Sequence, residues 1–167
     1  MSEQRAMTFA DDPGPATDGS AVPAAPPAFG PFEITDAPLQ VDDLVARVGT
    51  PGDGAVVTFV GIVRDNQDGR GVLALEYEAY AEMAEAEMRA LSLAVAGEYG
   101  LHGIAIRHRV GKLAIGEISV VIAVAAAHRE AAFAACAAVL DRLKTQVPVW
   151  KKEYYADGAV WLGQGAG

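Results

Sequence analysis

Cysteine is almost absent from the 167-residue chain, which carries a single thiol at Cys136. One cysteine excludes an internal disulfide and fits a reducing compartment. Cys136 lies among apolar residues of a predicted helix, so we interpret it as a small core residue rather than a nucleophile. The sequence also lacks CxxC, HExxH, GxGxxG and GxxxxGK[ST] motifs, which leaves zinc, dinucleotide and P-loop sites without support. We therefore expect no metal and no cofactor of the chain's own.

Long apolar runs are missing as well. The longest, Ile118 to Ala127, spans ten residues, whereas a membrane-spanning helix needs about 20. The N-terminus lacks the basic and apolar segments of a signal peptide. A net charge of −9 argues against a general binder of nucleic acid or anionic membranes. The sequence thus predicts a cytoplasmic protein with no nucleic-acid and no membrane partner.

Basic residues are few, but most of them are concentrated in the second half of the chain. A local group of cations on an acidic protein indicates a specific anionic ligand. The residues concerned are Arg107, His108, Arg109, Lys112, His128, Arg129, Arg142, Lys144, Lys151 and Lys152.

The first 30 residues are rich in Ala, Pro, Gly, Asp and Ser without periodicity, so we predict a disordered tail at 1–30 and one domain at 31–167. Hydrophobic periodicity predicts the elements of that domain. The expected helices are 41–48, 81–99 and 127–147, and the expected strands are 32–35, 55–63, 72–80, 104–110, 117–125, 149–155 and 159–162. We expect 72–80 to be the hairpin partner of 55–63. This order predicts an α+β fold, a mostly antiparallel sheet with helices on one face.

The segment Ala127–Glu153 contains the most unusual placement of a charge. A period of 3.6 residues puts Lys144 near the middle of an apolar helical stripe, and Pro148 ends the helix soon afterwards. A buried ammonium is costly unless it is paired. Lys144 therefore either extends to solvent at the helix end or is retained for its chemistry. The stripe consists of Phe133, Cys136, Ala137, Leu140, Leu143 and Val147.

Four blocks in this order resemble the large, catalytic subunit of molybdopterin synthase. They are GAVVTFVGIVRDN (54–66), the turn at 109–111 with the later Gly116, SVVIAVAAAHREAAF (119–133) and LKTQVPVWKKE (143–153). The most specific feature is LKTxxPxWK, with two lysines seven residues apart and an AHR sixteen residues before the first lysine.

The resemblance implies an α/β-hammerhead-like sandwich with a small extra β subdomain. It also implies a homodimer that forms the core of a heterotetramer. Each end would bind a small ubiquitin-like sulfur-carrier subunit, whose C-terminal Gly-Gly carries a thiocarboxylate. The implied substrate is cyclic pyranopterin monophosphate, which two sulfur transfers convert to the dithiolene of molybdopterin.

By the same resemblance, Lys144 and Lys151 are the catalytic residues, while Arg64, His128 and Arg129 bind the substrate. The residue types agree with these roles, because two anions have to be brought together. Arg64 follows a strand and can bind phosphate in bidentate fashion. His128 and Arg129 begin a helix, whose N-terminus attracts anions. We expect Lys144 to be the general acid or base, because of its apolar surroundings, and Lys151 to hold the phosphate or stabilise developing charge.

One feature departs from the family pattern. Many relatives have a basic residue shortly after the last tryptophan, whereas here Trp161 is followed by LGQGAG.

Two other hypotheses stay open: a non-catalytic module that docks a ubiquitin-like Gly-Gly tail, and an unrelated α+β protein that binds a phosphorylated metabolite. The presence of both Lys144 and Lys151 favours the enzyme over the docking module. A helix of about 20 residues is about 30 Å long, so the two ends of 127–147 can share a ligand only through a bend, a shorter helix or a second subunit.

Overall fold

The computed structural model describes residues 26–162. Its helices are α1 (Val41–Val48), α2 (Ala81–Tyr99) and α3 (Arg129–Gln146). Its strands are β1 (Ala28–Thr35), β2 (Ala55–Ile62), β3 (Asn66–Gln67), β4 (Arg70–Gly71), β5 (Ala74–Ala79), β6 (Gly103–Arg109), β7 (Gly111–Ala114), β8 (Ile118–Ala126), β9 (Val149–Tyr155) and β10 (Gly158–Leu162). The bounds of α1, α2 and β9 are those predicted from the sequence, and α3 is three residues shorter than predicted.

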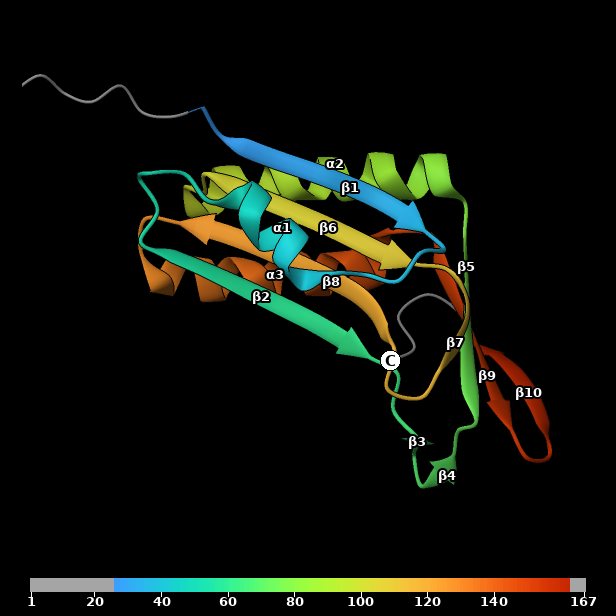
Figure 1. Cartoon of the computed structure of the whole chain (residues 1–167). Helices are drawn as coiled ribbons and strands as arrows, with labels where there is room; N and C mark the ends of the chain where they lie inside the picture. The colour runs from blue at the N-terminus through green and yellow to red at the C-terminus, as the bar shows by residue number, and fades with distance from the viewer. Residues whose placement is uncertain (1–25, 163–167) are drawn as a thin grey trace, which may run out of the picture.

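The main sheet has four strands in the order β1-β6-β8-β2 (Figure 1). The β6–β8 and β8–β2 pairs are antiparallel, whereas β1 runs parallel to β6. Strand β8 is buried along almost its whole length, because it is a central strand covered on both faces. This explains why its sequence is continuously apolar rather than alternating.

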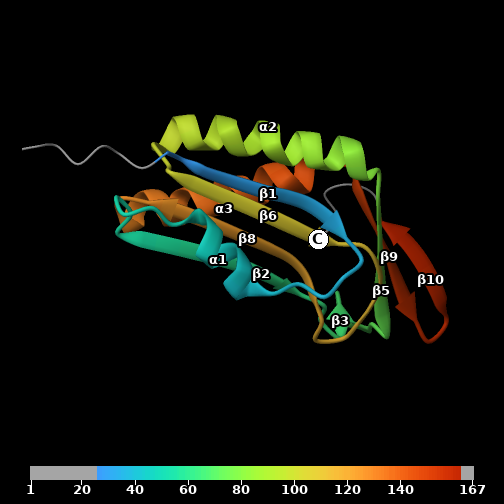
Figure 2. The same cartoon turned by 45° about the horizontal axis from the view of Figure 1, so that its top comes forward.

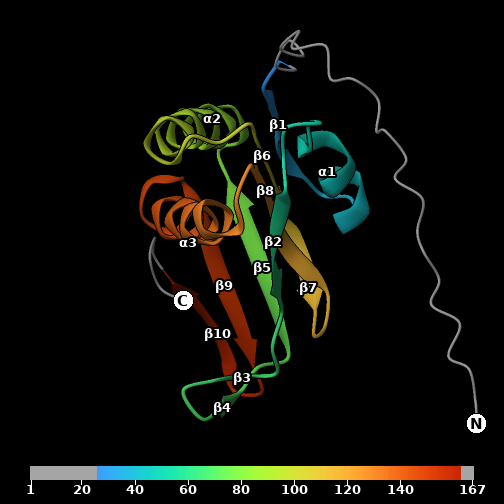
Figure 3. The same ribbon diagram turned by 90° about the vertical axis from the view of Figure 1, so that its left-hand side faces the viewer.

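Helices cover both faces of this sheet (Figure 3). Helices α2 and α3 pack on one face against Ile106, Ile122 and Val124. Helix α1 packs on the other, where Leu44 and its neighbours meet the intervening residues of β6 and β8. The α+β class is confirmed. The expectation of helices on a single face holds for α2 and α3 but not for α1, because alternate residues of the central strands are apolar on both sides.

A second sheet, ordered β10-β9-β5-β7, lies at one end of the main sheet and forms the small β subdomain (Figure 2). The prediction that the segment 72–80 pairs with 55–63 was wrong, since β5 pairs with β7 and β9 and β2 pairs with β8. Between β2 and β5, the two-residue strands β3 and β4 form a small hairpin of their own. This insertion lets the chain leave the first sheet and enter the second.

The N-terminal boundary lies slightly earlier than predicted. Strand β1 begins at Ala28, inside the predicted tail, because Ala28 and Phe29 pair with the start of β6. The rest of the predicted tail, residues 1–25, and the last five residues of the predicted domain lie outside the described residues. Within residues 26–162, no helix is long and apolar enough to cross a membrane.

Candidate functional site

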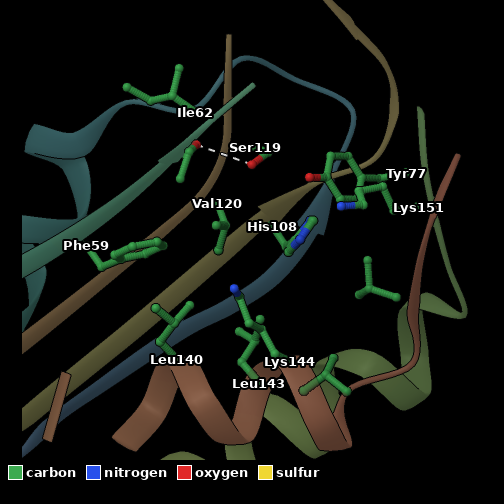
Figure 4. A pocket seen from close by; sticks show the side chains of 13 residues that line it. Phe59, Ile62, Tyr77, His108, Ser119, Val120, Leu140, Leu143, Lys144 and Lys151 are labelled. Atoms are coloured by element: carbon green, nitrogen blue, oxygen red, sulfur yellow. Dashed lines mark hydrogen bonds between the residues drawn. The ribbon is translucent and has the colours of Figure 1, made fainter. Parts of the chain in front are cut away.

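The end of α3 and the start of β9 bring the two lysines together. The helix ends at Gln146 because Pro148 disfavours helical geometry for Val147, and the chain then returns as β9. Lys144 is in the last turn of α3, and Lys151 is the third residue of β9. Both side chains line the same two adjoining cavities. The amino group of Lys144 extends from α3 into the first of these cavities (Figure 4).

Lys144 is exposed, so its predicted place on the apolar stripe of α3 was wrong. Phe133, which was expected to be buried, is 64% exposed. Cys136 is buried as predicted, and its burial raises the pKa of the thiol. Alanines occur all around α3, so the sequence offers too little contrast to fix which face is buried. The stripe that packs on the sheet consists of Ala132, Ala135, Cys136, Val139 and Leu143.

Lys151 is the more buried of the two lysines, and it forms an ion pair within its own strand. Its side chain is 14% exposed, and its Nζ lies 3.1 Å from Oε1 of Glu153, whose side chain is 2% exposed. The Tyr155 hydroxyl donates a short hydrogen bond to Oε2 of the same carboxylate, and this contact is the main cause of the raised pKa of Tyr155. Lys151 and Glu153 are two residues apart on one strand, so their side chains project from the same face. The sequence predicted Lys144 to be the more buried lysine, and the structure shows the reverse.

The second cavity, of about 310 Å³, combines the lysines with Arg64. Arg64 follows the end of β2, and its guanidinium donates a short hydrogen bond to Oε1 of Gln67. Gln67 and Asn66 line the same cavity from the β3–β4 hairpin. Arg64, Lys144 and Lys151 therefore converge on this cavity from three separate segments. Three cations against one carboxylate, Glu153, leave a positive cavity on an acidic protein.

The first cavity, of about 210 Å³, adjoins the second at the two lysines. Beyond the lysines, one wall carries the neutral polar groups Tyr77, His108 and Ser119 (Figure 4). The Tyr77 ring meets the His108 ring edge-on with 5.0 Å between centroids. Burial raises the pKa of Tyr77, which hydrogen-bonds to Ser119. The opposite wall is aliphatic and consists of Leu140, Leu143, Val147 and Val149.

Burial lowers the pKa of His108 to about 4, so the ring is neutral at neutral pH. Its Nδ1 lies 2.9 Å from the carbonyl oxygen of Arg109. A carbonyl only accepts, so Nδ1 carries the proton and donates it to this bond. Nε2 is consequently a hydrogen-bond acceptor.

His128 and Arg129 do not join the other predicted site residues within one chain. His128 is the N-cap of α3 and Arg129 is its first residue, and both are exposed. Arg129 precedes Lys144 by 15 residues and His128 by 16, a distance of about 23 Å along the helix. The helix is continuous over 18 residues, so a markedly shorter helix is excluded as an explanation of this mismatch.

Most of the other predicted cations have structural partners elsewhere. Arg107 pairs with Glu33 at 2.7 Å and Arg109 with Glu117 at 3.0 Å. Arg142, expected to be solvated, pairs with Glu98. Lys152, also assigned to solvent, lies over the rings of Tyr154 and Trp161. The cationic half of the sequence is therefore not a single anion pocket.

Sequence reasoning missed the roles of Tyr77, His108, Ser119 and Glu153 in lining these cavities. Two signals were available. Glu153 has the same strand phase as Lys151, and His108 has the same phase as the buried Ile104 and Ile106. Tyr77 carried no such signal, because it reaches Lys151 only through the pairing of β5 with β9.

Comparison with known proteins gives a consistent result. The family model described as MoaE protein matches residues 34–146. The chain is 44% identical over 126 residues to the molybdopterin synthase catalytic subunit of Thermoplasma volcanium, covering 75% of this chain and 92% of the relative. It is 39% identical over 137 residues to that of a Nostoc species, covering 81% and 83%. The crystal structure of molybdopterin synthase from Staphylococcus aureus superposes with a TM-score of 0.76 at 38% identity, covering 79% of this chain and 96% of the other.

Proposed function

Because the chain belongs to the MoaE family of molybdopterin synthase catalytic subunits, we propose that it is the sulfur-transferring large subunit of a molybdopterin synthase. The observation that carries this proposal is the convergence of Arg64, Lys144 and Lys151 on one cavity from three segments of the chain. A cytoplasmic location remains a prediction from the sequence.

The proposed substrate is cyclic pyranopterin monophosphate, and the proposed sulfur donor is the C-terminal Gly-Gly thiocarboxylate of a separate, small ubiquitin-like subunit. Both are anions at neutral pH, so their approach is opposed by mutual repulsion. Cations already fixed around the cavity lower this barrier without reorganising during the reaction. In this proposal Arg64 binds phosphate, and both lysines stabilise the charge that accumulates where donor and acceptor meet.

The acid–base role expected for Lys144 rested on burial, and the structure removes that reason because Lys144 is exposed. Lys151 is the more buried lysine, and Glu153 fixes its ammonium at the cavity wall. We assign Lys151 to the fixed stabilisation of charge and Lys144 to contact with the incoming donor at the exposed rim.

His128 and Arg129 enter this proposal through a second copy of the chain. They cannot reach the cavity of their own chain, because an unbroken helix holds them at its far end. In the proposed symmetric dimer, the start of one α3 lies beside the open site of the other chain. The two sites of such a dimer, each bound to one small subunit, give the heterotetramer.

Reconstitution tests the proposal. The chain is mixed with a thiocarboxylated small subunit and cyclic pyranopterin monophosphate, and molybdopterin is measured. We expect activity, and a loss of roughly 100-fold or more in Lys144→Ala and Lys151→Ala, as for removal of a charge-stabilising group. Lys152→Ala is the matched control, because it removes a neighbouring lysine that lies over aromatic rings instead. An active Lys144→Ala or Lys151→Ala variant rejects that lysine's role, and partner binding without conversion by the native chain favours the non-catalytic docking module.

A further inference from the structure

The two cavities that meet at the lysines differ in chemistry. The second contains Arg64 and the amides of Asn66 and Gln67. The first has no charged side chain other than the shared lysines, and its remaining walls are aliphatic, aromatic or neutral polar. An anionic phosphate is suited to the second cavity. The first suits an uncharged segment that brings few polar groups of its own.

His108 is the polar group of the first cavity with unused capacity. The residue is 5% exposed, and its Nδ1 is engaged by the Arg109 carbonyl. The Tyr77 hydroxyl bonds to Ser119, and Ser119 donates to the Gly61 carbonyl at 3.2 Å. Within the described part of the chain, no hydrogen bond to His108 Nε2 is seen. Nε2 is not among the fully buried side-chain atoms that lack a partner, so it keeps some exposure to the cavity. A ligand that fills the cavity closes this exposure, and a donor on the ligand then avoids the cost of an unmet acceptor.

We propose that His108 binds the C-terminal tail of the partner subunit, with its Nε2 accepting a hydrogen bond from a main-chain N–H of the terminal Gly-Gly segment. This inference rests on the proposed function, and it assigns the first cavity to the tail. His108 is then a tail-binding residue that sets how deeply the donor carbon reaches between Lys144 and Lys151.

Three observations favour the tail over the pterin as the occupant. The volume of about 210 Å³ lies below the roughly 300–1,000 Å³ typical of small-molecule sites. Glycine has no side chain, so the wall formed by Leu143, Val147 and Val149 can approach the main chain closely. A peptide N–H enclosed by such a wall needs an acceptor. His108 Nε2 supplies one that stays unprotonated at neutral pH.

The test measures binding of a synthetic ten-residue peptide that ends in Gly-Gly to the full chain. The proteins compared are the native chain, His108→Phe, which removes the acceptor at similar size, and His108→Gln, which restores an acceptor near the Nε2 position. Two further peptides carry an N-methyl group on one or the other glycine nitrogen. Thermal unfolding of each variant checks that it is folded.

We expect His108→Phe to weaken binding roughly tenfold, as for an unsatisfied buried N–H, and His108→Gln to recover most of the affinity. One of the two N-methyl peptides should bind the native chain about tenfold more weakly than the unmodified peptide. Its affinity for His108→Phe should be no lower still, because both changes remove the same hydrogen bond. Equal affinity for the native chain and a folded His108→Phe, or additive losses, overturns the role of His108 and leaves the proposed function intact. If the native chain binds no Gly-Gly peptide, the docking part of the proposed function fails, and this inference fails with it.

Discussion

Nζ of Lys151 lies 3.1 Å from Oε1 of Glu153, a carboxylate that is almost completely buried. Glu153 also accepts the Tyr155 hydroxyl, so the carboxylate is fixed from two sides. This pair places a positive charge at the wall shared by the two cavities. Its geometry makes Glu153 the residue that positions Lys151.

The first prediction concerns the variant Glu153→Gln, which keeps the shape of the side chain but removes its charge. Lys151 then remains mostly buried without its counter-ion. We expect a loss of about 3 kcal/mol in the free energy of unfolding, since breaking a buried pair on one side is strongly destabilising. We also expect at least a tenfold loss of activity. Denaturant unfolding and the reconstituted assay measure the two effects.

Glu76→Gln is the matched control, because Glu76 accepts a tyrosine hydroxyl on the same sheet but is only half-buried. It should cost less than about 1 kcal/mol and leave activity close to native. A Glu153→Gln variant that resembles Glu76→Gln in both measurements contradicts the positioning role.

The second prediction tests the two-copy site by mixing inactive variants. One variant carries Lys144→Ala and Lys151→Ala, and the other carries His128→Ala and Arg129→Ala. In a mixed dimer, one of the two sites has all four native residues. Random exchange should therefore restore about a quarter of native activity, as two-fold symmetry requires. A mixture as inactive as its components means that His128 and Arg129 do not complete a neighbouring copy's site.

The third prediction concerns the dependence of stability on pH. His108 has a pKa of about 4 in the folded chain, against about 6.5 when unfolded. Between these values the unfolded chain binds a proton that the folded chain does not, so stability falls as the pH falls from about 6.5 to 4. The full loss is about 3 kcal/mol.

His108→Gln removes this titration while His102 and His128 remain. The difference in unfolding free energy between the native chain and His108→Gln should therefore shrink by about 3 kcal/mol from pH 7.5 to pH 4. His128→Gln, at an exposed position, is the control for the replacement of a histidine by glutamine. A pH-independent difference for His108→Gln shows that His108 is not held neutral by burial.

The fourth prediction concerns the attachment of the β3–β4 hairpin. Nη2 of Arg70 lies 2.7 Å from Oδ1 of Asp157, and its guanidinium carbon lies 3.8 Å from the ring centroid of Tyr155. These contacts tie the hairpin that carries Asn66 and Gln67 to β9 and to the turn before β10. Arg70→Ala should therefore loosen one wall of the second cavity.

We expect Arg70→Ala to cost less than about 1 kcal/mol in global stability, because the ion pair is exposed. Amide hydrogen exchange at residues 64–71 should become faster, and the affinity for inorganic pyrophosphate should fall several-fold. Arg47→Ala, an exposed change on α1, serves as the control and should affect neither quantity. Unchanged exchange in Arg70→Ala means that the hairpin is ordered without this attachment.

Elements with clear local signals were predictable from the sequence. Helix α2 ends as expected at Gly100, whose φ of 63° suits glycine, and α3 ends where Pro148 requires it. The phase of α3 was not determined, because its many alanines make several faces equally apolar. The pair of lysines was found through spacing and family resemblance, although the burial argument for Lys144 was wrong.

Which residues share a cavity depends on long-range pairing between the strands and helices. Strand β5 pairs with β9 rather than β2, and this pairing alone brings Tyr77 beside Lys151. His108 reaches the same cavity from β6, and Arg64 arrives from the end of β2. The separation of His128 and Arg129 from the lysines likewise follows from an unbroken α3. Local sequence encodes helix and strand through short-range periodicity, whereas the contents of a site depend on pairings between segments distant in the chain, which short-range patterns do not specify.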